Sequence, residues 1–283
     1  MMRFCAGAIA LAAFAGGAQA LQVIDDRGVG IVLERPAARI VALSPHLAEI
    51  AFAAGAGAKL AGVSAFSNHP AEARRLPVIA SGGRVDLERL IALSPDLVLA
   101  WQSGNSVLQL ARLEQLGLRV FATEVRTLAD IARVMRLVGA LAGSSTVAEE
   151  RAQQFERAVQ QLRERHANDR RIAVFLEIWH RPMLTVNGAH LMSDAIGLCG
   201  GRNIFSGAKT LTAVVSREQL LGARPEAIVT GEGAPEDWRG LETVPGVRAG
   251  RIHAVDPDLL YGQGPGILDG VRTLCERLAR ARG

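Results

Sequence analysis

The sequence of 283 residues is poor in aromatic side chains and in lysine. Phe, Trp and Tyr together make up 4% of it, and lysine occurs only at Lys59 and Lys209. The 28 acidic residues nearly balance the 32 basic ones, and no cluster of cations alternates with aromatic rings. This composition does not indicate nucleic-acid binding. Because aromatic rings are scarce, each one predicted in a loop is worth examining.

Motifs of exported hydrolases and of redox proteins are also absent. We find no G-x-S-x-G, no H-E-x-x-H, no S-x-x-K with its partner motifs and no C-x-x-C. The glycine pairs 82–83 and 200–201 and the glycine-rich stretch 262–266 are more typical of turns than of a phosphate-binding loop. The six histidines do not have the spacing of a closed zinc site. We therefore expect no enzyme, no resident metal and no cofactor.

The first 20 residues have the composition of a secretory signal. Arg3 supplies the positive start, the apolar stretch 8–15 is shorter than the roughly 18 residues of a membrane span, and 18–20 form a small-x-small cleavage site. Cys5 precedes the apolar stretch, which is too early for a lipid-modified cysteine. We expect cleavage after Ala20 and a soluble periplasmic protein, with an uncleaved anchor as the alternative.

Processing would leave two cysteines, Cys199 and Cys275. In an oxidising exported compartment such a pair is more often joined than free, so a disulfide is expected. The alternative is that both are small buried hydrophobic residues on helices.

A pattern of residues occurs twice, from Asp86 to Ala100 and again from Ser216 to Thr230. Each copy begins with a residue that can cap a helix and has Glu88 or Glu218 in the first turn. A proline then ends the helix, an acid follows, and a branched apolar run predicts a buried strand. The repeat predicts two similar α/β lobes with a cleft between them, and the two glutamates at equivalent points.

Hydrophobic periodicity fills in the rest of an α/β pattern. We predict a hairpin at 23–33, strands at 40–43, 60–63, 97–100, 119–121, 172–178 and 252–255, and helices at 45–54, 86–93, 106–116, 128–141, 192–198 and 267–281. A long polar helix at 146–166 carries one narrow apolar stripe and suits a connector, although a coiled coil is the alternative. The predicted organisation is a signal at 1–20, an N-terminal lobe at 21–143, a connecting backbone helix at 144–167 and a C-terminal lobe at 168–283.

Five ordered blocks carry a resemblance to a known family. They are Leu43–Gly55, Gly62–Pro70, Pro95–Trp101, Cys199–Phe205 and Val215–Gln219. From about Arg39 to its end the chain resembles the helical-backbone (class III) substrate-binding proteins of ABC importers, and most closely the cobalamin-binding members. The resemblance implies two Rossmann-like lobes with central β-sheets, joined by a single long helix. It also implies a corrinoid held between the lobes, with haem or a ferric siderophore as the alternative ligand.

The resemblance further implies a cleft lined by aromatic rings, but this chain departs from the pattern. Phe66 and Trp101 stand where the family has pocket-side aromatic residues. The stretch 81–83 replaces an expected Trp, and Leu184 and Thr212 stand at two further aromatic positions. Rigid rings bury the broad apolar face of a corrin at little entropic cost, so these three losses bear on the identity of the ligand.

Other aromatic and histidine side chains are expected in loops near the cleft. Trp179, His180 and Tyr261 could compensate for the missing rings. His46 follows a proline at a strand end facing the expected cleft, where a neutral imidazole could approach cobalt or iron as an axial contact. The alternative is a helix-start histidine bonded to the backbone.

The matched acids Glu88 and Glu218 have two explanations. A carboxylate in the first turn of a helix is stabilised by the helix dipole. The resemblance implies a second role, in which the two acids, one on each lobe, meet arginines on the two permease subunits of an ABC transporter. The expected partner is thus an inner-membrane permease with its ATPase. A monomer with two matched lobes suits such a twofold partner. Matched lobes and aromatic loops argue against a purely structural or adhesive exported protein.

Overall fold

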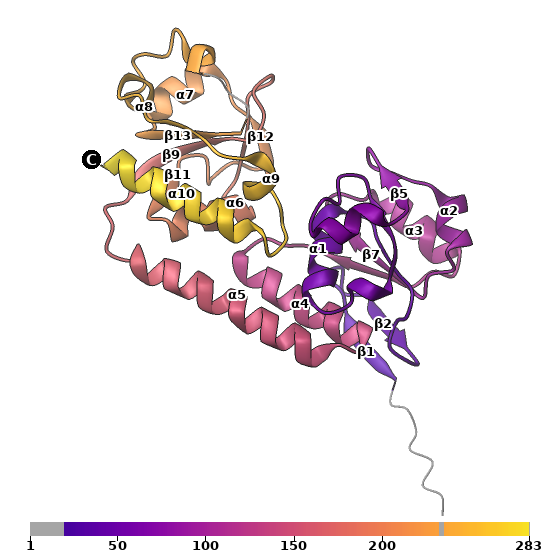
Figure 1. The fold of residues 1–283 in the computed structure, drawn as a ribbon. Coiled ribbons are helices and arrows are strands. Elements are labelled where there is room, and N and C mark those ends of the chain that lie inside the picture. The colour runs from indigo at the N-terminus through magenta and orange to yellow at the C-terminus, as the bar shows by residue number, and fades with distance from the viewer. Residues whose placement is uncertain (1–19, 232–234, 283) are drawn as a thin grey trace, which may run out of the picture.

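The computed structural model describes residues 20–231 and 235–282, so residues 1–19 of the predicted signal segment lie outside the described residues. Two α/β lobes are joined by the long helix α5 (Ser145–Arg165), which runs along one side of the molecule (Figure 1). This confirms the predicted fold class. No helix within the described ranges is long and apolar enough to cross a membrane.

The N-terminal lobe is built on a six-stranded sheet with the order β6-β5-β4-β3-β7-β8. Its strands are β3 (Ile40–Ala42), β4 (Leu60–Ser64), β5 (Val78–Ser81), β6 (Arg84–Val85), β7 (Leu97–Trp101) and β8 (Val120–Thr123), and only β6 is antiparallel. The helices are α1 (Pro45–Ala53), α2 (Leu87–Ala92), α3 (Val107–Gln115) and α4 (Leu128–Ala142), with 3-10 turns at Gly57–Lys59 and Ala71–Arg75. The predicted leading hairpin is present as β1 (Leu21–Ile24) and β2 (Gly30–Leu33).

The C-terminal lobe has a four-stranded parallel sheet with the order β11-β9-β13-β14. Its strands are β9 (Ile172–Glu177), β11 (Gly201–Asn203), β13 (Ala227–Thr230) and β14 (Ile252–Ala254), and β10 (Leu184–Val186) pairs separately with β12 (Thr212–Val214). The helices are α6 (Leu191–Leu198), α7 (Arg217–Ala223), α8 (Pro245–Arg248), α9 (Pro257–Leu260) and α10 (Ile267–Arg282), with a 3-10 turn at Pro235–Trp238. The predicted Cys199–Cys275 disulfide is present and joins the end of α6 to α10.

The connecting helix α5 packs closely against α4. Its apolar stripe is buried, as the sequence predicts, and consists of Ala148, Ala152, Phe155, Val159 and Leu162. This close approach requires glycine at position 139 of α4, because a Cβ there would lie 2.2 Å from the Cβ of Ala148. On the outer side the guanidinium of Arg136 donates to the carboxylates of Glu149 at 2.7 Å and of Glu156 at 2.6 Å.

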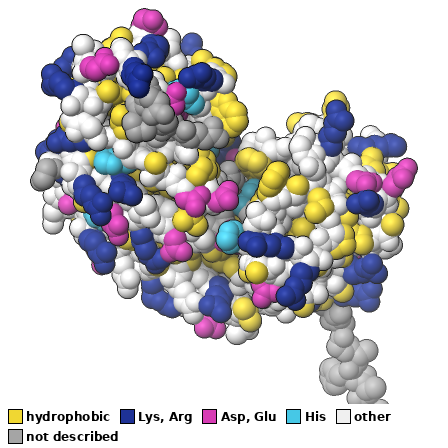
Figure 2. Space-filling model, turned by 45° about the horizontal axis from the view of Figure 1, so that its top comes forward, with side chains coloured by type: hydrophobic (Ala, Val, Ile, Leu, Met, Phe, Trp, Pro, Cys, Tyr) yellow, Lys and Arg dark blue, Asp and Glu magenta, His cyan; other side chains and the backbone are white. Residues whose placement is uncertain are grey.

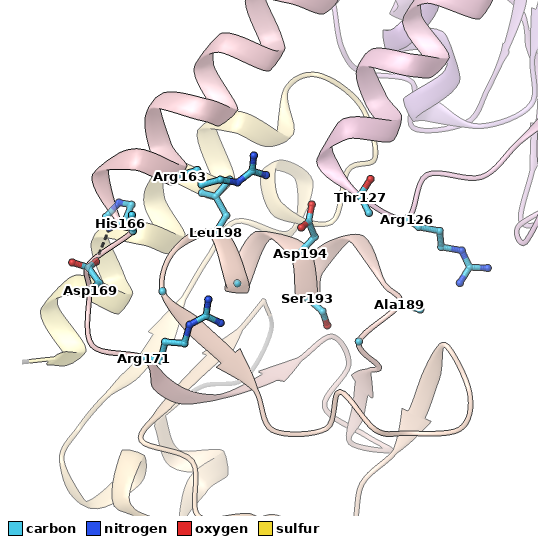
Figure 3. A pocket seen from close by; sticks show the side chains of 14 residues that line it. Arg126, Thr127, Arg163, His166, Asp169, Arg171, Ala189, Ser193, Asp194 and Leu198 are labelled. Carbon is cyan, nitrogen blue, oxygen red and sulfur yellow. Dashed lines mark hydrogen bonds and ion pairs between the residues drawn. The ribbon is translucent and has the colours of Figure 1, made fainter.

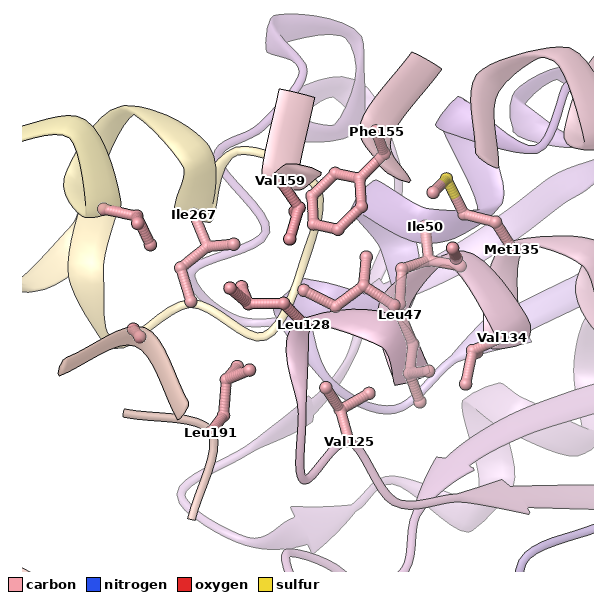
Figure 4. Packing of buried hydrophobic residues seen from close by; sticks show 14 of the residues in the cluster. Leu47, Ile50, Val125, Leu128, Val134, Met135, Phe155, Val159, Leu191 and Ile267 are labelled. Carbon is pink, nitrogen blue, oxygen red and sulfur yellow. The ribbon is translucent and has the colours of Figure 1, made fainter. Parts of the chain in front are cut away.

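The hydrophobic core is continuous from one lobe to the other. Leu47 and Leu128 of the N-terminal lobe, Phe155 of the connector, and Leu191 and Ile267 of the C-terminal lobe belong to one buried cluster (Figure 4). Separating the lobes would expose this apolar surface to water, which costs roughly 25 cal/mol of free energy for each Å² exposed. The shared core therefore holds the two lobes in a defined relation.

The predicted repeat extends to backbone conformation and hydrogen bonding. Ser94 and Arg224 occupy equivalent positions after α2 and α7, and both adopt left-handed backbone angles, with φ values of 46° and 48°. Asp96 accepts hydrogen bonds from the N–H groups of residues 38 and 39 at 2.9 Å, and Glu226 likewise accepts from the N–H of residue 173 at 2.9 Å. In each lobe this acid satisfies backbone donors at or just before the start of the neighbouring central strand.

Candidate functional site

One wall of the cleft is formed by the carboxyl ends of the N-terminal strands. A hollow of about 300 Å³ is lined there by Phe66, Trp101 and small residues that include Ala65, Ala80 and Gly104. Gly104 allows the indole to lie against the backbone, because a Cβ at this position would be 1.9 Å from the Trp101 ring. The backbone N–H of Trp101 donates to Asn105 Oδ1 at 2.9 Å, which fixes the end of β7. The result is an apolar surface with one large half-buried ring.

Phe66 projects from the loop after β4. Its side chain is 80% exposed and its backbone is left-handed, with φ 64°. A non-glycine residue in this region costs roughly 1 to 2 kcal/mol. An exposed ring on such a backbone contributes little to the fold, so the strain points to a role at the surface of the cleft.

The base of the cleft lies between the lobes. A second hollow of about 320 Å³ is lined by His46, Glu49, Phe66 and His69 from one lobe and by Tyr261 and its neighbours Pro257, Asp258 and Gly262 from the other. A space-filling view shows the molecule hollowed between the lobes, with histidine and acidic side chains there (Figure 2). Residues separated by more than 200 positions in sequence thus share one site.

His46 is buried at this base and packs edge-on against Trp101, with ring centroids 5.3 Å apart. Burial lowers the pKa of His46 to about 3, so the imidazole is neutral at ordinary pH. Its Nδ1 lies 3.2 Å from the hydroxyl of Ser44. The alternative of a histidine bonded to the backbone receives no support from these side-chain contacts.

Glu49 connects α1 to the other lobe. Its carboxylate accepts a hydrogen bond from the N–H of Gly266 at 2.5 Å, just before α10 begins. Burial raises the pKa of Glu49, although the Gly266 N–H and nearby His69 act in the opposite direction. A carboxylate at the start of a helix is favourable, so this contact helps to fix the base of the cleft.

The opposite wall is organised by Glu177 at the end of β9. This carboxylate is 1% exposed and accepts hydrogen bonds from the Thr230 hydroxyl at 2.6 Å and from His180 Nδ1 at 2.7 Å. The Tyr261 hydroxyl donates to the Glu177 carbonyl at 2.8 Å. His180 Nε2 also lies 3.4 Å from Asp237. One buried residue thus positions two of the predicted side chains, His180 and Tyr261.

The structure brings together some of the predicted ligand residues and leaves others apart. His46, Phe66, Trp101 and Tyr261 line the two hollows. Trp179, Leu184 and Thr212 line neither of them. Trp179 is 49% exposed and forms a β-bridge with Leu184, while Thr212 is exposed at the start of β12. Glu49 and Glu177 could not be recognised from the sequence, because Gly266, which contacts Glu49, and Thr230 and Tyr261, which contact Glu177, are far away along the chain.

A larger groove, about 760 Å³, lies at the junction of α4, α5 and α6 (Figure 3). Arg126, Arg163 and Arg171 line it, together with acids that have partners: Asp194 accepts from the Leu128 N–H at 2.8 Å, and Asp169 pairs with His166 at 2.8 Å. Among the described residues that line this groove, only His166 carries a ring. Such charged walls do not suit a flat apolar ligand. In the part of the chain that the structure describes, no group of three or more His, Cys, Asp or Glu could hold a metal ion.

The two matched acids lie outside the cleft. Glu88 and Glu218 are exposed in the first turns of α2 and α7, one on each lobe. A hydrogen bond from the Ser216 hydroxyl lowers the pKa of Glu218. Both helices lie on the side of the molecule away from α5 (Figure 1).

Two lobes, a shared core and an aromatic cleft define a substrate-binding protein. The model of the periplasmic binding protein family matches residues 40–244, and the chain belongs to this family. Within it, the chain is 34% identical to the vitamin B12-binding protein of Vibrio cholerae over 87% of its length and 91% of that protein.

Solved structures agree with this assignment. The crystal structure of the periplasmic vitamin B12 binding protein of Vibrio cholerae superposes with a TM-score of 0.82 at 34% identity, over 87% of this chain and 98% of that one. The periplasmic haem-binding protein of Roseiflexus sp. RS-1 superposes with a TM-score of 0.76 at 24% identity, over 87% and 99% of the two chains, and so shares the fold.

Proposed function

We propose that this protein captures cobalamin or a related corrinoid in the periplasm and delivers it to the permease of an ABC importer. The observation that carries the proposal is the cleft itself, in which Trp101 and Phe66 face an opening that Tyr261 reaches from the other lobe. The similarity to vitamin B12-binding proteins over most of the chain supports the same ligand class. The protein has no catalytic role in this scheme and acts as an exported monomer after cleavage behind Ala20.

Binding relies on the shape and rigidity of the two walls. A corrin presents broad apolar faces, and the rings of Trp101 and Phe66 can cover them with little loss of conformational entropy. Tyr261 and His180 approach from the C-terminal lobe, where Glu177 holds both. In this scheme Trp179, which forms a β-bridge with Leu184, would extend this wall outward, and Thr212 would leave room where the family has a ring.

His46 is the side chain we propose for contact with the metal-bearing face of the ligand. Because its pKa is lowered to about 3, a nitrogen lone pair is present throughout the physiological range. The corrinoid brings its own cobalt as part of the cargo. His46 would therefore contact the cobalt of the bound corrinoid, and the protein itself would hold no resident metal.

Haem or a ferric siderophore is the second candidate ligand. The cleft offers an imidazole at His46 and a phenol at Tyr261, and both groups are known axial ligands of haem iron. Calorimetric and absorbance titration of the mature protein with cyanocobalamin, cobinamide, hemin and a ferric siderophore separates the candidates. Heat and a spectral change with the corrinoids alone support the proposal, and a response to hemin alone replaces it with the second candidate.

A further inference from the structure

Two hydrogen bonds between described residues join the lobes directly, and they run in opposite directions. Glu49 on α1 of the N-terminal lobe accepts at 2.5 Å from the N–H of Gly266, immediately before α10 of the C-terminal lobe. Asp194 on α6 of the C-terminal lobe accepts at 2.8 Å from the N–H of Leu128, the first residue of α4 in the N-terminal lobe. Each lobe therefore supplies one carboxylate to the start of a helix in the other.

A helix start is a favourable place for such a contact. The first N–H groups of a helix have no acceptor within it, and the helix dipole favours a negative charge there. At α4 the local capping box of Thr127 and Asp130 leaves the N–H of Leu128 without an acceptor in its own lobe. Asp194 satisfies this donor from the other lobe.

The contact of Glu49 is close enough to require glycine on the opposite side. A Cβ at Gly264 would lie 2.1 Å from Oε2 of Glu49, and a Cβ at Gly266 would lie 2.8 Å from Oε1. A side chain at either position would displace the carboxylate from the backbone N–H. The glycine-rich stretch 262–266 thus gives this acid access to the backbone of the other lobe.

The core that the lobes share lies beside both contacts. Leu128 and Ile267, the first residues of α4 and α10, belong to its buried cluster (Figure 4). Apolar burial is non-directional, so it favours contact between the lobes without selecting one angle between them. A hydrogen bond requires a defined distance and direction. The two carboxylates therefore supply the directional part of the interface.

The two contacts stand at different points along the connector α5. Glu49 borders a hollow of about 590 Å³ that Arg151 of α5 also lines, whereas Asp194 borders the larger groove that Arg163 lines (Figure 3). These arginines are roughly 18 Å apart along the helix axis, at about 1.5 Å per residue. One contact alone would leave the lobes free to turn about it, and two separated contacts oppose that rotation.

We propose that these two bonds form an interlobe clamp that sets the opening of the cleft, and that Glu49 and Asp194 are positioning residues for the ligand. The inference rests on the proposed binding of a corrinoid between the lobes. Asp194 lines neither hollow of the cleft, so it acts on the ligand through the lobes. Glu49 lies on α1 with His46, and its partner Gly266 follows the segment of Tyr261, so this bond also spans the base of the cleft.

A defined opening matters because the ligand is held from both sides. If only a fraction of the molecules has the opening that binds, the apparent Kd rises by the inverse of that fraction. Loss of the clamp that reduces this fraction to about one tenth therefore weakens binding about tenfold. The effect arises before the ligand arrives, as a loss of preorganisation.

Pulsed electron spin resonance on the ligand-free mature protein tests the clamp. Spin labels are attached at Leu108→Cys on α3 and Glu276→Cys on α10, two exposed positions on different lobes, while the disulfide protects the native cysteines. We expect one narrow distribution of interlobe distances with the clamp intact. The double variant Glu49→Ala with Asp194→Ala should broaden or shift it.

Amide variants provide the matched control for this measurement. Glu49→Gln and Asp194→Asn keep an acceptor oxygen and should keep the narrow distribution. If the double alanine variant does not fold, the single variants Glu49→Ala and Asp194→Ala give the same comparison. A distribution that is unchanged in the alanine variants would overturn the clamp, as would equal broadening in the amide variants.

A calorimetric titration with cyanocobalamin gives the functional readout. Asp194→Ala should raise Kd by about tenfold, whereas Asp194→Asn should stay within about twofold of wild type. Asp269→Ala, at an exposed acid in the first turn of α10, is the control and should bind normally. Wild-type affinity in Asp194→Ala would overturn the positioning role. If wild type binds no corrinoid, the proposed function fails, and the interlobe distances still decide whether the clamp exists.

Discussion

The carboxylate of Glu177 accepts a hydrogen bond from the His180 ring at 2.7 Å, and this pair organises the C-terminal wall of the cleft. The same carboxylate also accepts from Thr230, and the Glu177 carbonyl accepts from Tyr261. Donors from three separate segments therefore converge on one residue that is almost completely buried. A wall built in this way is rigid before any ligand arrives, which reduces the entropic cost of binding.

Glu177→Ala should lower the free energy of unfolding by about 2 to 4 kcal/mol, because it leaves buried donors without their acceptor. Denaturant unfolding of the variant beside wild type measures the loss. Glu34→Ala, at an exposed carboxylate, is the matched control and should change little. An unfolding curve for Glu177→Ala that coincides with wild type would show that the buried pair contributes nothing to stability.

Stability should fall as the pH is lowered, and His46 should contribute to the fall. Its folded-state pKa of about 3 lies below the ordinary value of 6.5, so the unfolded chain binds a proton that the folded chain excludes. The resulting stabilisation is complete above pH 6.5 and is lost as the pH falls toward 3. His190, with its pKa lowered to about 4 by burial and by Arg126, acts in the same direction.

His46→Gln removes one of these contributions. Between pH 7 and pH 5 the variant should lose about 2 kcal/mol less unfolding free energy than wild type, since each pKa unit corresponds to about 1.4 kcal/mol. Urea unfolding at a series of pH values measures the two slopes. Equal slopes of unfolding free energy against pH in variant and wild type would mean that folding does not lower the pKa of His46, so that the folded protein also binds this proton.

The Cys199–Cys275 disulfide closes a loop with a sequence separation of 76. Replacing both cysteines by alanine should lower the unfolding free energy by roughly 2 to 5 kcal/mol, as expected for a loop of this size. Thermal unfolding of the variant and of wild type with and without reductant measures the difference. Two free thiols in denatured, unreduced protein from the periplasm would contradict the pairing in the native protein.

Charge reversal at the two matched acids should abolish transport. Glu88→Arg with Glu218→Arg would place like charges against the cations that we expect on the permease, while the cleft stays intact. Uptake of labelled cyanocobalamin in cells and calorimetric affinity of the purified protein are measured together. Glu72→Arg, at an exposed acid outside α2 and α7, serves as the control. Normal uptake, or a loss of ligand affinity, would refute the docking role of these acids.

Most long elements of the fold could be predicted from the sequence because their hydrophobic periodicity is strong. The strands around Ile40 and Leu97 and the stripe along α5 occur where the sequence predicts them. Short elements were not predictable: β6 has two residues, β11 three, and α8 and α9 four each, too few for any period to show. The pairing of β10 with β12 depends on contacts between distant segments.

The site could be predicted only where a single motif carries it. Phe66 and Trp101 lie in blocks that the resemblance identifies, and both line the cleft. Glu49 acts through Gly266, 217 positions away, and Glu177 joins the nearby His180 to Thr230 and Tyr261, which are 53 and 84 positions away, so the roles of both acids depend on the fold. Trp179 is predicted near the ligand because it is a loop aromatic; it lines neither of the two hollows, and its contact with ligand stays a prediction.

We expect a corrinoid to bind between the two lobes, against Trp101 and Phe66 on the N-terminal wall of the cleft. Calorimetric titration of wild type and Trp101→Ala with cyanocobalamin, side by side, tests it most directly. Truncating a central aromatic side chain should cost at least about 2 kcal/mol of binding, or roughly thirtyfold in Kd, against a measurable wild-type affinity. Equal affinities within about twofold, or no binding by wild type, would contradict the account.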